Sequence, residues 1–214
     1  MWVTEGTALF LRAVDGSTDT ELDGPSLLPG WTRRHVLAHV AANATAIGRL
    51  VTWARTGMPD PMYSSPEQRA DEIEHGAQQP VSWLRKEIRR TAAELAPALV
   101  DLPDTVVVTA RGRHVPATEL PWMRAREVCV HAVDLDAGIR FDALPTGFLA
   151  ALVTEVVDGR TGPALRLTAT DTGATWQVTG DGEPVAVELP LARLAGWLTG
   201  RETRTDLPEL PSWL

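Results

Sequence analysis

Long stretches in which apolar residues recur at helical spacing dominate the first 145 residues of this 214-residue chain. Such a repeat places the apolar side chains on one face of a helix, and several such helices can bury these faces against one another. Proline and glycine separate the stretches, as in the loop 57–66 with its three prolines. The sequence therefore predicts a helical bundle over residues 1–145. The expected helices cover residues 3–15, 32–55, 66–76, 80–100 and 120–138, and a short hairpin is expected over residues 105–115.

The pattern changes after Pro145. One more helix is expected up to residue 158, and from there apolar and polar residues alternate at period two, which is typical of half-buried strands. The expected strands cover residues 164–169, 175–179 and 185–189, and a closing helix covers residues 191–198. We therefore expect residues 146–214 to form a small α+β domain, and the fold class of the whole chain to be α+β.

Composition limits the classes of function. Hydrophobic residues make up 44% of the chain and charged residues 22%, the formal net charge is -8, and no run of basic residues forms a continuous stripe. Nucleic-acid binding through phosphate neutralisation is therefore not expected. No apolar run approaches the length of a membrane helix and the N-terminus lacks a signal-peptide pattern, so we expect a cytoplasmic protein without a membrane partner. The single cysteine excludes an internal disulfide.

Four residues on two of the expected helices have the spacing of metal ligands. His35 and His39 lie four residues apart on one helix, and Glu127 and His131 lie four residues apart on another. A Glu and a His at this spacing can reach one ion, and one imidazole from the neighbouring helix completes a set of two nitrogens and one carboxylate. That set suits zinc and leaves a coordination position open, as in catalytic sites.

The neighbours of these residues favour an inward orientation, although a solvated helix face is the alternative interpretation of the spacing alone. Apolar residues surround them, namely Val36, Leu37 and Val40 in one segment and Val128, Val130, Val133 and Leu135 in the other. Polar groups that point into a bundle need partners. Asp134, one turn beyond His131, is placed to orient a ligand imidazole. Arg124 shares the face of Glu127 and is expected to line the site or its rim.

Two segments resemble the signature of mycothiol-dependent maleylpyruvate isomerases: residues 26–39 (SLLPGWTRRHVLAH) and residues 120–136 (LPWMRAREVCVHAVDLD). Residues 55–63 and 195–201 add weaker matches. The resemblance implies a DinB-like four-helix bundle that holds zinc, followed by a sterol-carrier-like α+β domain. It also implies that the ligands are His39, Glu127 and His131, with His39 preferred to its rival His35.

The resemblance further implies cis–trans isomerisation of maleylpyruvate, or a related cis-enedioate, to fumarylpyruvate. Rotation about a double bond requires that bond to become single for a time, and reversible addition of a thiolate achieves this. Cys129 stands where the family usually has an aromatic residue, and it lies two residues from both Glu127 and His131, so it faces another side of the helix. We therefore expect Cys129 to be a core residue, the thiol to come from mycothiol, and zinc to lower the pKa of that thiol.

A dianionic substrate requires basic side chains. Arg201 is the best candidate for a catalytic carboxylate clamp, because a guanidinium can bind a carboxylate through two hydrogen bonds. Arg69 is a second candidate for substrate binding, with a surface charge as the alternative. Asp134 is the other residue assigned to catalysis. The expected partners are thus a small-molecule carboxylate and a thiol coenzyme, and the expected state is a monomer.

Two other functions use the same metal motif. A mycothiol S-transferase would add the thiolate to an electrophile without later elimination. A non-catalytic metal-binding or regulatory protein could keep the DinB-like fold without the reaction. An intact set of ligands together with Arg201 favours the isomerase over the non-catalytic alternative, whereas the metal motif by itself does not separate the isomerase from the transferase.

Overall fold

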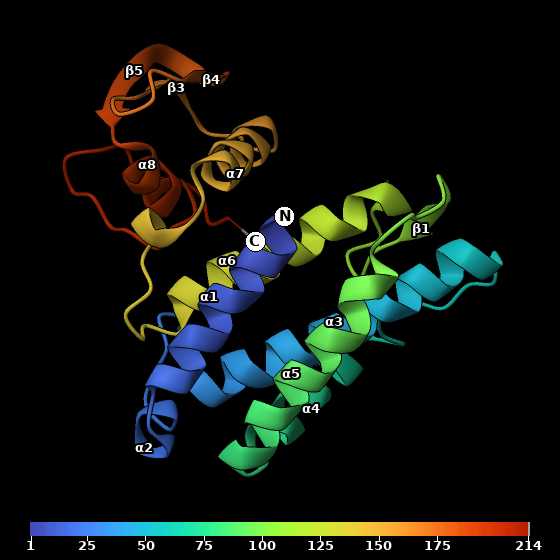
Figure 1. Ribbon diagram of the computed structural model, residues 1–214. Helices are drawn as coiled ribbons and strands as arrows, with labels where there is room; N and C mark the ends of the chain where they lie inside the picture. Colours follow the sequence, from blue (N-terminus) through green and yellow to red (C-terminus); the bar gives the residue numbers. More distant parts are fainter. Residues whose placement is uncertain (214) are drawn as a thin grey trace. The chain divides into compact units, whose positions relative to one another are not determined.

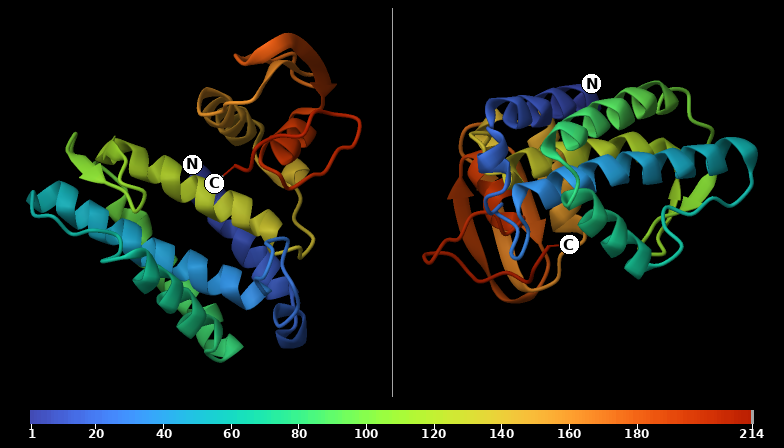
Figure 2. Two further views of the ribbon diagram at one scale, coloured as in Figure 1. Left: turned by 180° about the vertical axis from the view of Figure 1, so that it is seen from behind. Right: turned by 90° about the horizontal axis from the view of Figure 1, so that it is seen from below.

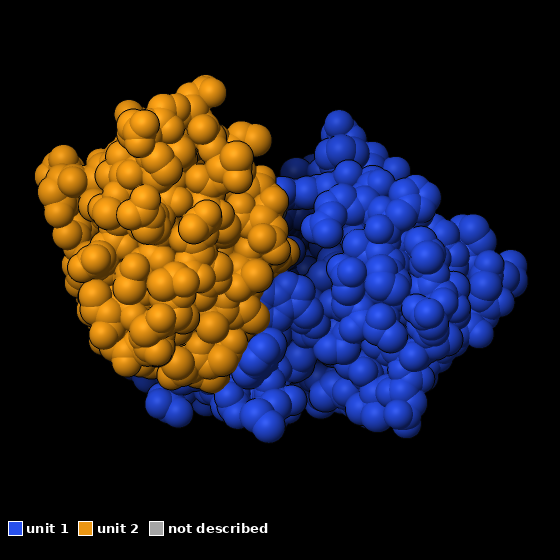
Figure 3. Space-filling view, turned by 90° about the horizontal axis from the view of Figure 1, so that it is seen from above, with its two compact units in different colours: residues 1–139 blue, residues 140–214 orange. Residues whose placement is uncertain are grey.

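The computed structural model describes residues 1–213 and contains two compact units, Met1–Ile139 and Arg140–Leu214, which Figure 3 colours separately. Leu214, the last residue of the predicted second domain, lies outside the described residues. The domain boundary that the sequence predicts after residue 145 stays a prediction. Within the described chain, no helix combines the length and the apolar character needed to cross a membrane.

The first unit is built from helices (Figures 1 and 2). Its helices are α1 (Trp2–Gly16), α2 (Asp19–Leu22), α3 (Arg33–Thr56), α4 (Pro66–Ala77), α5 (Val81–Ala98) and α6 (Leu120–Asp134). Four long helices form the bundle: α6 packs on α1 and α3, and α5 packs on α3 and α1, while α4 lies against α3. The strands β1 (Val106–Val108) and β2 (His114–Pro116) pair as the predicted antiparallel hairpin, and the 3-10 helix η1 (Ala117–Glu119) leads into α6.

The second unit contains the 3-10 helix η2 (Phe141–Ala143), α7 (Thr146–Asp158), β3 (Pro163–Ala169), β4 (Thr175–Val178), β5 (Asp181–Leu189) and α8 (Leu191–Leu198). The strand order is β4-β3-β5, with β4 antiparallel and β5 parallel to β3. Alternate residues of the strands, such as Leu165, Leu167 and Val187, are buried. The predicted α+β fold class is confirmed.

Helix α3 carries one side of the site, and its residues explain its packing. Thr32 precedes it, and the Nδ1 atom of His35 accepts the backbone N–H of Thr32 at 3.2 Å, which satisfies one donor of the helix start. Gly57 ends the helix in the left-handed conformation, at φ 72°. A side chain at Gly76 would come within 2.8 Å of the Ala38 Cβ atom, so this glycine allows α4 to lie close to α3 beside His39.

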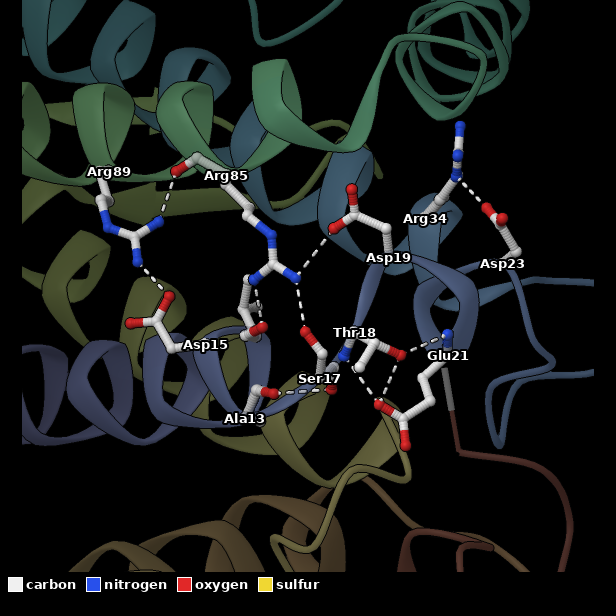
Figure 4. A network of polar contacts seen from close by, with 11 residues as sticks. Ala13, Asp15, Ser17, Thr18, Asp19, Glu21, Asp23, Arg34, Arg85 and Arg89 are labelled. Carbon is white, nitrogen blue, oxygen red and sulfur yellow. Dashed lines mark hydrogen bonds and ion pairs between the residues drawn. The ribbon is translucent and has the colours of Figure 1, made fainter.

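Arginines of α5 fasten the end of α1 (Figure 4). Arg85 donates to the backbone carbonyl of Val14 and, at 2.6 Å, to that of Ser17, both at the C-terminal end of α1. The last carbonyls of a helix have no N–H donors from a following turn, and the Arg85 guanidinium supplies donors there, in addition to the Ser17 N–H that the Val14 carbonyl already accepts. Arg89 pairs with Asp15 on the same side. The turn that leads from α1 into α2 and α3 is thereby held on the bundle.

The helix expected over residues 120–138 ends earlier, at Asp134. Leu27 donates its N–H to the Asp134 carbonyl at 2.9 Å, and Arg33 donates to the carbonyls of Leu135 and Asp136 at 2.5 and 2.9 Å. Asp136 adopts a positive φ of 50°. Because partners distant in the sequence take these carbonyls, the helical hydrogen-bond pattern does not continue.

Three further expectations need correction. No element was expected between the helices 3–15 and 32–55, but this segment contains the short helix α2, which Thr18 caps reciprocally with Glu21. Pro80 lies just before α5 and not at its first position. The strand expected from residue 185 begins at Asp181, because Gly180, where a side chain would collide with the backbone at Gly162, brings the chain alongside β3 four residues earlier.

Candidate metal centre

One histidine of α3 meets a glutamate and a histidine of α6. The possible ligand atoms of His39, Glu127 and His131 lie within 4.8 Å of one another. The Nε2 atom of His39 is 2.9 Å from Oε2 of Glu127, and Nε2 of His131 is 3.3 Å from the same oxygen. The two imidazole rings stand edge to face, with centroids 4.8 Å apart. Both Nε2 atoms thus converge on one carboxylate oxygen.

The surroundings hold these side chains in place. His39 is only 4% exposed, and the indole ring of Trp31, just before α3, lies 5.6 Å from its imidazole ring. Asp134 is fully buried and its Oδ2 atom lies 2.9 Å from Nδ1 of His131. A carboxylate on Nδ1 orients the ring and leaves Nε2 directed at the site, the usual arrangement behind a metal-binding histidine. The structure therefore brings together the three predicted ligands and the predicted orienting residue.

The charge states in the metal-free structure follow from these contacts. Burial by itself would raise the pKa of Glu127, but the hydrogen bonds from His131 and His39 outweigh it and hold the pKa well below its usual value. Burial lowers the pKa of His39, which the bond to Glu127 only partly offsets. Burial also opposes protonation of His131, but Asp134 and Glu127 together raise its pKa to about 9. At neutral pH the site holds a carboxylate, a neutral imidazole and an imidazolium.

Arg69 of α4 borders His39, and Tyr63 of the loop before α4 interacts electrostatically with Arg69 and Glu127. The Nη2 atom of Arg69 lies 3.4 Å from Nδ1 of His39. The hydroxyl of Tyr63 is buried and has no hydrogen-bond partner among the described residues. Burial raises the pKa of Tyr63 to about 12, and the neighbouring charges include Arg69 and Glu127, so the phenol keeps its proton and can donate a hydrogen bond. An unsatisfied buried donor beside a cluster of possible ligands is consistent with a ligand site.

The donor set fits a divalent metal. Two imidazole nitrogens and one carboxylate oxygen are ligands that zinc prefers, and three protein ligands leave room for a further one. Asp134 behind His131 supplies the second contact that such ligands ordinarily have. A metal would take the place of the proton that His131 and Glu127 now share, so the polar groups that stabilise the metal-free site are the same ones that would bind the ion.

Other candidates lie elsewhere. His35 is outside the cluster: its Nδ1 atom contacts Thr32 and its Nε2 atom lies 3.2 Å from Glu74. Cys129 is buried on another face of α6, as predicted, and a side chain at Gly6 would collide with its sulfur. Arg201 belongs to the second unit, where it donates to the Thr199 carbonyl at 2.8 Å and lies 5.5 Å from the Trp213 ring.

Arg124 does not lie at the rim, as the sequence had allowed, but is buried between α6 and α3. Its partner Asn43 was not predicted from the sequence. Asn43 follows His39 by four residues and shares its helix face, so the same spacing rule that paired Glu127 with His131 could have found it.

We predict that His39→Ala and Glu127→Ala proteins lose stoichiometric zinc, because each change leaves only two of three ligands. His35→Ala is the matched control. It removes a histidine of the same helix, but His35 caps the start of α3 and lies outside the cluster. Zinc content after dialysis, measured by atomic absorption, checks this. Full zinc content in the first two variants would show the ligand assignment to be wrong.

We predict opposite pH trends for stability and metal binding. The pKa of His131 in the folded chain, about 9, exceeds the value of about 6.5 expected in an unfolded chain. The stabilisation from its protonation is therefore complete below pH 6.5 and is lost as the pH rises through 9. A metal must displace this one proton, so its affinity should rise about tenfold per pH unit towards pH 9. Chelator competition and urea unfolding of the metal-free protein, both from pH 6 to 9.5, measure the two trends.

In Asp134→Asn the pH at which the zinc affinity stops rising should be lower, because the carboxylate that raises the pKa of His131 is gone. A zinc affinity that stays constant from pH 6 to 9 in the unmodified protein would contradict the assigned charge states.

Comparison with known proteins identifies the family. The protein-family model of the mycothiol maleylpyruvate isomerase N-terminal domain matches residues 3–136 of this chain. Solved structures of the mycothiol-dependent maleylpyruvate isomerase and of a histidine-to-alanine mutant of it are each 34% identical to this chain. Each match covers 99% of this chain and 94% of the other, with TM-scores of 0.92 and 0.91. A search of curated proteins found no significant match. The family expected from residues 26–39 and 120–136 is confirmed, and the chain belongs to the mycothiol maleylpyruvate isomerase family.

Proposed function

We propose that the chain is a zinc- and mycothiol-dependent cis–trans isomerase that converts maleylpyruvate, or a related cis-enedioate, to fumarylpyruvate. The observation that carries the proposal is the convergence of His39, Glu127 and His131 on one point, in a chain that matches mycothiol-dependent maleylpyruvate isomerase structures over 99% of its length. In this proposal residues 1–145 form the metal-binding domain and residues 146–214 form a second domain, to which Arg201 belongs.

The three ligands set the charge of the centre. His39 and His131 would bind through neutral Nε2 atoms, so Glu127 is the one anionic ligand. A zinc ion held by these residues would supply Lewis acidity that lowers the pKa of the coenzyme thiol. With a dication and one carboxylate the centre keeps a net positive charge, which favours a thiolate over a thiol. Asp134 holds the His131 ring by its Nδ1 atom and is in this sense part of the catalytic arrangement.

The chain does not itself provide the nucleophile. Cys129 is buried, and burial raises the pKa of its thiol to about 12, so it carries no thiolate at neutral pH. A thiol coenzyme, mycothiol, fills this role in the proposal. When bound, it supplies a nucleophile whose reversible addition to the conjugated double bond permits rotation.

Residues beside His39 are suited to hold an anionic substrate. In the metal-free structure Arg69 faces the Nδ1 atom of His39, which must accept because Nε2 carries the proton toward Glu127. If Nε2 of His39 binds the metal, the proton of this imidazole lies on Nδ1. The Nδ1–H group of His39 and the guanidinium of Arg69 are then two donors that face each other. Arg69 would lose this partner and become available to a carboxylate. Tyr63 offers a buried hydrogen-bond donor in the same region, and Arg201 is proposed as the second clamp.

We predict that the zinc-loaded protein with mycothiol and maleylpyruvate forms fumarylpyruvate while the concentration of free thiol returns to its starting value. Absorbance of the isomers and thiol titration measure the two quantities in one reaction. Omission of mycothiol and the Glu127→Ala protein serve as controls, and both should be inactive. Stoichiometric loss of thiol with an adduct would instead show a mycothiol S-transferase, and inertness would show a non-catalytic metal-binding protein.

We predict that Arg69→Ala and Arg201→Ala each raise KM for the dianionic substrate about 10-fold or more, since a hydrogen bond to a charged group contributes roughly 1.5–3 kcal/mol. Arg90→Ala is the control, because Arg90 pairs with Glu87 and Glu94 on the exposed face of α5. Steady-state kinetics over a range of substrate concentrations give the values. An unchanged KM in either variant would exclude that arginine as a clamp.

A further inference from the structure

Arg124 is a charged residue in the core of the bundle. It lies on α6 one turn before Glu127 and is 1% exposed. Its flanking residue Ala125 and the next-turn residue Val128 are buried as well. Burial lowers the pKa of Arg124 to about 10, so the guanidinium still carries its charge at neutral pH. An apolar side chain of similar volume would commonly fill such a place with equal or greater stability.

The partners of Arg124 lie on α3, immediately next to His39. Its Nη1 atom donates to the backbone carbonyl of Val40 at 2.9 Å and to Oδ1 of Asn43 at 2.8 Å. Val40 follows His39 directly and Asn43 lies one turn further along the same face. Asn43 is itself 5% exposed, so its amide oxygen needs this donor. The arginine thus joins the helix that bears one ligand to the helix that bears the other two.

The position of this link matters because of how the ligands are distributed. Glu127 and His131 share α6, where helical spacing alone sets their separation. His39 comes from α3, and its distance to them depends on how α3 is shifted and rotated against α6. Metal ligands have to be placed to within a few tenths of an ångström. The link through Arg124 is within one turn of both His39 and Glu127, and its bonds to one helix carbonyl and one side chain resist both sliding and rotation.

We propose that Arg124 is a positioning residue of the metal centre: through Val40 and Asn43 it fixes α3 against α6 and so sets the His39 imidazole at the distance that the ion requires. This inference rests on the metal centre proposed above. Arg124 donates its hydrogen bonds to Val40 and Asn43, and its positive charge also interacts favourably with the carboxylate of Glu127.

The test compares Arg124→Met, which keeps the length of the side chain but removes its donors, with Arg85→Met. Arg85 is the matched control, because it too donates hydrogen bonds from one helix to another, but it binds backbone carbonyls and links α5 to the end of α1. Zinc affinity is measured by chelator competition, and the cobalt-loaded proteins are compared by their visible ligand-field absorption. We expect zinc binding about 10–100-fold weaker in Arg124→Met with an altered cobalt spectrum, intermediate values in Arg124→Lys, and unchanged zinc affinity and cobalt spectrum in Arg85→Met.

Asn43→Ala and Arg124→Lys decide the question if Arg124→Met shows no cooperative unfolding transition. Both keep the charge and one of the two bonds, and both should weaken zinc binding and shift the cobalt spectrum in the same direction. If the unmodified protein binds no metal, the proposed function fails. If it binds zinc and these variants match its affinity and cobalt spectrum, the metal centre stands and the role of Arg124 is overturned.

Discussion

The docking of α3 against α6 is the constraint on which the site depends. Neither helix can form the cluster alone, because one contributes a single imidazole and the other a carboxylate and an imidazole four residues apart. Helices α1 and α5 cover the other sides of this pair, and α4 lies against α3 at Ala38 where Gly76 leaves room. Packing of the bundle therefore also brings three polar side chains together, although His39 lies about ninety residues from the other two in the sequence.

Burial of these polar groups would be unfavourable without the contacts they make with one another. Glu127 is stabilised by two imidazoles, and His131 is held between two carboxylates. Protonation of His131 thus contributes to the stability of the metal-free fold, and a metal would replace this proton. The stability of the metal-free protein and its affinity for the ion depend on the same atoms. Both therefore vary with pH.

Several arginines of this chain link one element of the fold to another. Arg33 and Arg85 donate to carbonyls at helix ends, and Arg124 donates to a carbonyl within α3. In each case a guanidinium supplies donors that reach across from one element to another. Arg69 differs, because its contact with His39 is one that metal binding would remove.

The sequence by itself determined the fold class, nearly all helices and strands, and the pairing of Glu127 with His131, because helical spacing and capping residues act locally. The motifs at residues 26–39 and 120–136 identified the family. Spacing could not choose between His35 and His39, which share a face; the family resemblance preferred His39. In the structure His35 caps the start of α3 and contacts Glu74, whereas His39, one turn deeper, reaches α6. The end of α6, the burial of Arg124 and the role of Asn43 depended on partners far away in the chain. Only the tertiary structure could decide these, since a hydrogen bond between distant segments leaves no periodic trace in the sequence.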